Sequence, residues 1–223
     1  MAFADTSQTQ LAFGVQSALG VQQTTLAELR NTNSSLQFTA ESVQSQEIRA
    51  DRNVSDIIRT QSSTSGDIGF ELSYNTYDDL FQGVLSSAFT GAGTAGDPYT
   101  MVNGQTKKYE QFNDIEVDTL SLNMAASEIV TGSMSFMGID SAQSTTSIDG
   151  DGYTAASTSR VYNAVNMITS VEEGGVEFKS NIQSLTIDIT NNKRESRAIG
   201  SEAPSCIGDG QFVVTGQVTA KTY

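Results

Sequence analysis

The chain has 223 residues, with 12 lysines and arginines against 26 aspartates and glutamates, a net charge of −14, no histidine and one cysteine. Without histidine it cannot build a Ser-His-Asp triad, a Cys-His dyad or a histidine-containing zinc site, and Cys206 alone excludes an internal disulfide and a four-cysteine metal site. The acidic balance also argues against direct nucleic-acid binding, which depends on Lys and Arg displacing counterions from phosphates.

Alternation of apolar and polar residues predicts a mainly β fold. Hydrophobic residues make up only 37% of the chain, and much of the rest is Ser, Thr, Gln, Asn and Gly, which is typical of β-rich surfaces or of disorder. Strict alternation is what a half-buried strand requires, and a disordered chain has no reason to show it. It recurs in the segments 68–74, 115–124 (with one phase slip at Asp118-Thr119), 129–136, 184–189 and 212–220.

An internal repeat links three segments of the chain. Residues 64–70, 130–136 and 214–220 share the pattern x-[ST]-G-x-h-x-h, where h is apolar. Two of the copies follow a strand with a Ser-Leu pair, which predicts hairpin units reused in one sheet system; chance recurrence of short β patterns is the alternative. The shared glycine marks a position where a bulge or a close backbone approach is expected.

One segment departs from the β pattern. Apolar residues from Tyr77 to Ala88 recur at spacings of three and four, with two aspartates in the first turn, which predicts one amphipathic α-helix over about 76–87. Three stretches rich in small and polar residues, about 90–106, 141–159 and 191–209, are predicted to be long loops of a single domain spanning residues 1–223.

Motifs that could carry chemistry are weak. The G-x-G-x-x-G match at 91–96 follows a helix and runs into Asp97-Pro98, whereas a dinucleotide site needs it between a strand and a helix. The sequence 149–152 resembles the start of a calcium loop, but Arg160 stands where the bidentate Glu is required. Cys206 has no adjacent base. We therefore predict no enzyme activity, no catalytic, cofactor-binding or metal-binding residue, and no cofactor.

The segment 47–59 is distinctive because it concentrates three of the twelve basic residues and alternates them with acids. One interpretation is a solvated strand pair with surface ion pairs of about 0–1 kcal/mol each. The other is an interface in which mixed charges set the register between copies of the protein. Composition does not separate the two, and the candidate subunit-interface residues are Glu47, Arg49, Asp51, Arg52, Asp56 and Arg59.

Ordered blocks of sequence from about Leu36 onward resemble the major tail tube proteins of long-tailed, siphovirus-type bacteriophages. These blocks are 47–56 (EIRADRNVSD), 65–74 (SGDIGFELSY), 77–80 (YDDL), 119–122 (TLSL), 129–138 (IVTGSMSFMG), 163–166 (NAVN), 184–192 (SLTIDITNN) and 198–200 (AIG). Several blocks in the same order are far more specific than any single motif.

The resemblance implies a structural protein with a β-sandwich or barrel of two packed sheets and one flanking helix. It implies homohexameric rings that stack into the tail tube, the conduit for genome ejection, with contacts to the tail terminator, the tape measure and the baseplate or distal tail proteins. DNA would pass through an acidic lumen without specific binding, and the protein would be made in the host bacterial cytoplasm and reside in the virion.

Family members usually continue past the segment matching 215–220 into an acidic turn and further strands, whereas this sequence stops at Tyr223. Either the sequence is shortened or later strands are supplied differently, so the resemblance does not determine how the last edge of the sheet is closed. No stretch of the sequence approaches the length that spans a bilayer, and residues 1–20 lack the basic start and apolar run of a signal peptide, so we expect no membrane insertion. The alternatives are a ring or tube protein of a related bacterial injection or secretion system, and a surface adhesin-like β-module, which would need an export signal.

Overall fold

The computed structural model describes residues 9–48, 50, 56–85, 99–105, 108–148, 152–166, 168, 170–177 and 182–221. Within them a ten-stranded, largely antiparallel sheet follows the order β2-β1-β6-β7-β8-β5-β3, with β11 beside β7, β14 beside β11 and β4 beside β5. Its strands are β1 (Gln10–Val15), β2 (Ala27–Leu29), β3 (Asn33–Ser34), β4 (Gln37–Gln44), β5 (Ile57–Glu71), β6 (Tyr99–Gln105), β7 (Lys108–Ala125), β8 (Thr131–Ser144), β11 (Ile182–Thr190) and β14 (Val213–Ala220).

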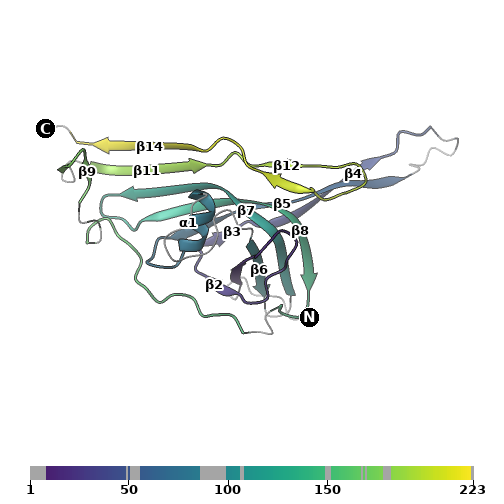
Figure 1. Cartoon of the computed structure of the whole chain (residues 1–223), viewed down its shortest axis with the longest axis horizontal. Coiled ribbons are helices and arrows are strands. Elements are labelled where there is room, and N and C mark those ends of the chain that lie inside the picture. The colour runs from purple at the N-terminus through teal and green to yellow at the C-terminus, as the bar shows by residue number, and fades with distance from the viewer. Residues whose placement is uncertain are drawn as a thin grey trace.

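The long strand β7 connects the two parts of this sheet. Its first half pairs with β6 and its second half pairs with β11, while β8 pairs along most of its other side. The strands β7 and β8 bend between these halves, so that β6 and the start of β7 run at a steep angle to β11 and β14 (Figure 1). The prediction of a mainly β fold with one short helix is confirmed.

The phase slip predicted at Asp118-Thr119 is a β-bulge. The register between β7 and β8 shifts by one residue between Val117 and Thr119, so Asp118 has no direct partner on β8. Its backbone carbonyl accepts a hydrogen bond from the N–H of Asn191 (2.8 Å), and its carboxylate accepts one from the N–H of Lys193 (2.8 Å). Asp118, the extra residue of the bulge, therefore binds the backbone that directly follows β11.

The repeated units lie side by side in the sheet. The pair β7–β8 and the pair β14–β11 each place the Ser-Leu strand against the glycine strand, and β7 and β11 also pair with each other. Leu122 lies opposite Gly132, and Ile187 lies opposite Gly216. Only β7 and β8 are consecutive strands, because residues 191–212 separate β11 from β14.

The core lies between the bent sheet and helix α1 (Asp78–Leu85). The helix begins two residues after the predicted start at 76, and the predicted residues 86–87 lie outside the described residues. Leu80 and Val84 of α1 are buried. Tyr77, which precedes the helix, is 1% exposed, and its ring centroid lies 4.4 Å from that of Phe70. The Tyr77 hydroxyl donates toward the backbone carbonyls of Arg30 (2.8 Å) and Glu71 (3.1 Å), and burial raises its pKa to about 12.

The loop predictions were wrong in part. The stretch 90–106 contains β6, and the first four residues of 141–159 belong to β8. The stretch 191–209 contains β12 (Arg194–Ser196) and β13 (Cys206–Gly208), which pair as a small antiparallel sheet. Another small sheet joins β9 (Glu172–Glu173) and β10 (Val176–Glu177). Strands of two or three residues are too short to show alternation, which explains why the pattern missed β12 and β13.

Candidate assembly surfaces

A two-stranded ribbon projects from the body of the molecule, and we call it the arm: β4 and residues 57–60 of β5. Every residue of the arm is exposed. Figure 1 shows the arm extending from the end of the molecule opposite the C-terminus. A two-stranded ribbon with both faces in solvent has no core of its own and is at best marginally stable alone. We therefore expect the arm to contact other molecules.

The predicted interface stretch 47–59 joins the two strands of the arm. Of its six candidate residues, the structure describes Glu47, Asp56 and Arg59; Arg49, Asp51 and Arg52 lie outside the described residues. The backbone carbonyl of Asp56 accepts a hydrogen bond from the N–H of Ser45 (2.9 Å), and the N–H of Glu47 donates to the Ser45 hydroxyl (3.3 Å). Of the described candidates, Glu47 and Asp56 thus lie beyond the paired strands of the arm, and Arg59 lies on the arm strand β5.

Arg59 is engaged within its own chain. Its Nε lies 3.1 Å from a carboxylate oxygen of Glu202, and its guanidinium lies 5.2 Å from the centre of the Phe38 ring. Both partners of the ion pair are about half exposed, so the pair contributes little to stability. The ion pair matters for geometry instead, because it holds the Arg59 guanidinium over one face of the arm, beside Phe38.

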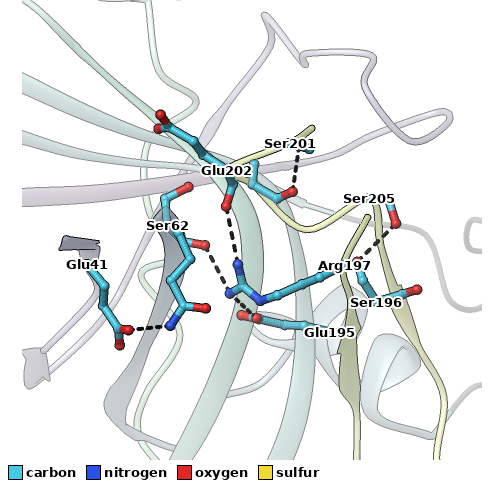
Figure 2. A network of polar contacts seen from close by, with 10 residues as sticks. Glu41, Ser62, Glu195, Ser196, Arg197, Ser201, Glu202 and Ser205 are labelled. Carbon is cyan, nitrogen blue, oxygen red and sulfur yellow. Dashed lines mark hydrogen bonds and ion pairs between the residues drawn. The ribbon is translucent and has the colours of Figure 1, made fainter. Parts of the chain in front are cut away.

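A polar network fixes the root of the arm, where β5 enters the sheet (Figure 2). Ser62 is buried, and its N–H donates to the carbonyl of Glu202 (2.9 Å) while its own carbonyl accepts from Arg197 (3.1 Å). Arg197 also donates to the Glu202 carbonyl (3.2 Å) and contacts Glu195. The connection between β12 and β13 therefore takes the place of a neighbouring strand at this point of β5.

A buried lysine, Lys193, anchors the segment that contains β12 and β13 to strand β7 of the sheet. The side chain of Lys193 is 5% exposed, and its ammonium lies 2.5 Å from a carboxylate oxygen of Glu116 on β7 and 2.6 Å from one of Asp209. Burial alone lowers the pKa of this ammonium, but the hydrogen bonds to Asp209 and Glu116 outweigh burial, and the pKa is raised. Nearby, the N–H of Gly210 donates to the carbonyl of Asn191 (3.1 Å), which closes the base of the 191–212 segment.

The strand β14 forms an outer edge of the sheet. Among the described residues it pairs only with β11, and all eight of its residues are exposed. Phe212 and Val214 are 47% and 55% exposed, which is unusual for large apolar side chains beside a core. Unlike the arm, this feature was not among the predicted interface residues. The alternation in 212–220 predicted the strand, but alternation carries no signal that tells an edge strand from an interior one.

A mainly apolar cavity of about 310 Å³ lies where β7 ends and β11 begins. It is lined by Met124, Ile182, Leu185 and other uncharged residues. A cavity without a titratable side chain offers no general acid or base. No three His, Cys, Asp or Glu side chains in the described ranges are grouped to hold a metal ion. The predicted motif at 91–96 and residues 149–151 lie outside the described residues, whereas Cys206 is an exposed free thiol on β13.

No helix of the described chain is long and apolar enough to cross a membrane.

Comparison with solved structures found matches of low sequence identity. One match is a chain of the anti-feeding prophage baseplate, with TM-score 0.47 and 11% identity, covering 65% of this chain and 97% of that chain. Another is a chain of the sheath-tube complex of PVC, an extracellular contractile injection system (TM-score 0.42, 10% identity, coverage 61% and 88%). A third belongs to the tail of an empty GTA particle (TM-score 0.35, 11% identity, coverage 65% and 99%).

Comparison with curated proteins found no match. The family assignment comes from the sequence instead. A family model described as phage tail tube protein matches residues 6–223, which is nearly the whole chain. This match is consistent with the resemblance seen in the sequence. The chain therefore belongs to the phage tail tube protein family, as a structural, non-enzymatic component that forms the tube of the tail.

Proposed function

We propose that this protein closes into hexameric rings which stack into the tail tube of a long-tailed, siphovirus-type phage, after synthesis in the cytoplasm of the host bacterium. The tube would then meet the tail terminator at one end, the baseplate or distal tail proteins at the other, and the tape measure protein inside. Residues 1–223 would act as one tail tube domain. The family match supports the tube itself, and the sequence blocks support the finer assignment.

The observation that carries ring closure is the position of the two exposed elements. The arm and β14 extend in opposite directions along the long axis of the subunit (Figure 1). A contact between two different surfaces of identical subunits is heterologous, and it generates either a closed ring or an open filament. A subunit with interaction elements at opposite ends suits such head-to-tail contacts better than a symmetric dimer.

The acidic composition suits a conduit for DNA. With a net charge of −14 on each copy, a ring accumulates carboxylates, and those that face the lumen repel the phosphates that pass. Screening limits this field to about 8 Å at physiological ionic strength, so the repulsion acts near the wall. The DNA would slide without binding, because retention requires Lys and Arg on the wall.

Electron microscopy of the purified protein tests the proposal. We expect rings or tubes with six-fold symmetry, whose formation increases with protein concentration. A species that stays monomeric at every concentration, and that is absent from purified virions, would contradict the assignment. Tubes of another symmetry would retain the tube and overturn the hexamer.

A further inference from the structure

The apolar face of the sheet continues past the core onto β14, where the chain leaves it uncovered. One cross-strand row runs from Leu120 on β7 through Ile189 on β11 to Val214 on β14. The exposed fractions along this row are 4%, 7% and 55%. A parallel row joins Met124, Leu185 and Val218, and Val218 is 51% exposed. The same face is therefore buried or half-buried on β7 and β11 and solvent-exposed on β14.

The outer edge of β14 also lacks the features that normally protect a sheet edge. Natural edge strands carry charges, proline or bulges, or are covered by another element. The sequence of Val213–Ala220 contains no charged residue and no proline, and its pairing with β11 is regular from Ser184 to Thr190. In the described chain no other strand pairs with it. An uncharged edge with an apolar face is suited to receiving another strand.

The arm has the matching properties. Its strand β4 has eight residues, as β14 does, and among the described residues β4 pairs only with β5. Val43 and Ile58 lie directly opposite each other across the arm, and they are 58% and 56% exposed. The other face is partly covered by Arg59 over Phe38. That face also exposes Ile57, but Ile57 lies opposite Gln44, so the face with Val43 and Ile58 is the one that pairs two exposed apolar side chains.

We propose that the arm of one subunit lies along β14 of the next, with the free edge of β4 hydrogen-bonded to β14, so that Val43 lies beside the exposed valines of β14 and Ile58 continues the same apolar face one strand further. The inference rests on the proposed assembly of copies into rings. Charge favours this pair of surfaces, because most faces of a chain with net charge −14 repel a second copy, whereas β14 has no charge and β4 has only Glu41. The arm then fills the hydrogen bonds and the apolar contacts that each subunit leaves open.

Two variants that each block one side test the contact. Val218→Lys places a charge on the β14 face, and Ile58→Lys places one on the arm face; both sites are more than half exposed, so the monomer should fold. The matched controls are Gln217→Lys and Gln44→Lys, which put lysine on the opposite face of β14 and on the opposite face of the arm. We expect each blocked variant alone to lose assembly about tenfold or more, as loss of roughly 1.4 kcal/mol of contact implies, and both controls to assemble more than their blocked counterparts.

Mixing the two blocked variants gives the sharper result. The Val218→Lys subunit keeps its arm and the Ile58→Lys subunit keeps its β14, so the mixture should form dimers that cannot grow. Analytical ultracentrifugation would detect these dimers. To capture the dimers as disulfides, Cys206→Ser is introduced in both variants. Val43→Cys is then added to the Val218→Lys subunit. In separate experiments, Val214→Cys or Val218→Cys is added to the Ile58→Lys subunit. Thr215→Cys on the opposite face is the control.

A disulfide-linked dimer that appears only in the mixture and is stronger with 214 or 218 than with 215 supports the proposal. Tubes from either blocked variant alone, or no dimer with either cysteine, overturn it. The proposed function fails separately: if the unmodified protein never forms rings but the mixture dimerises, the arm contact stands without the tube. If the unmodified protein and both blocked variants form tubes, the tube stands and the arm contact is wrong.

Discussion

Gly66, Gly132 and Gly216 occupy the same position of the repeated pattern, yet alanine should have a different cost at each. At Gly66 a Cβ would lie 2.5 Å from the Leu36 Cα and 2.5 Å from the Ser35 carbonyl oxygen, and φ is +156°. Backbone cannot move away as a side chain can, and residues 35 and 67 are held together by hydrogen bonds in both directions (2.8–2.9 Å). Gly66 is thus a close backbone approach, as predicted.

The magnitudes follow from these surroundings. Overpacking costs about 1–3 kcal/mol and an unfavourable positive φ about 1–3 kcal/mol, so Gly66→Ala should lower the free energy of unfolding by roughly 4 kcal/mol. At Gly132 a Cβ meets side chains, the Phe70 Cζ at 2.5 Å and the Leu122 Cδ2 at 2.9 Å, and the cost is about 1–3 kcal/mol. At Gly216 the only close atom is the Thr186 carbonyl oxygen at 3.1 Å, and the change stays within about 1 kcal/mol.

Thermal and urea unfolding of dilute, unassembled protein, followed by circular dichroism, measures the three differences. For a chain of this size 1 kcal/mol corresponds to roughly 2–4 °C in Tm, so Gly66→Ala should lower Tm by roughly 8–16 °C. Gly216→Ala, which carries the same sequence pattern, is the internal control. Equal losses at the three positions, or a larger loss at Gly216 than at Gly66, would refute the reasoning from backbone proximity.

Three further predictions concern charges and the anchor of the helix. Lys193→Met should lower the free energy of unfolding by about 3 kcal/mol, because it leaves Glu116 partly buried without its cation. Lys108→Met breaks only the exposed pair with Glu110 and should lower it by no more than about 1 kcal/mol. Equal losses of the two variants in a urea titration would contradict this. The pKa of Tyr77 is raised from 10.0 to about 12 in the folded protein, so on raising the pH the unfolded chain loses this proton first. The stabilisation that the protonated Tyr77 hydroxyl contributes is therefore complete below pH 10 and declines between pH 10 and 12. Tyr77→Phe should flatten the fall of Tm over that range, and an unchanged slope would rule out Tyr77 as its source. Reversing charge at Arg49 or Arg52 should reduce ring or stack yield in electron micrographs while Tm is unchanged; undiminished tubes would mean that the 47–59 stretch is only solvated.

Local sequence determined the elements of this protein whose signal is a side-chain period. The alternation predicted the long strands, and the phase slip at Asp118-Thr119 marked the position where the structure has a bulge, because one extra residue inverts the faces of everything after it. The spacing from Tyr77 onward predicted α1, because only a helix places such residues on one buried face. The ordered blocks identified the family, and with it the function, before any contact was known.

Tertiary structure alone decided where those elements meet and which surfaces stay open. The alternation of Phe212, Val214 and Val218 is the same as that of Leu120 and Leu122, but the first set lies on an edge strand and the second on an interior strand. Hydrogen-bond partners on a strand come from distant parts of the chain, so the period of a segment does not record whether one or both sides are paired. For the same reason the sequence predicted the charges of the 47–59 stretch as the interface, whereas the uncovered face of β14 is evident only from the pairing of β7, β11 and β14.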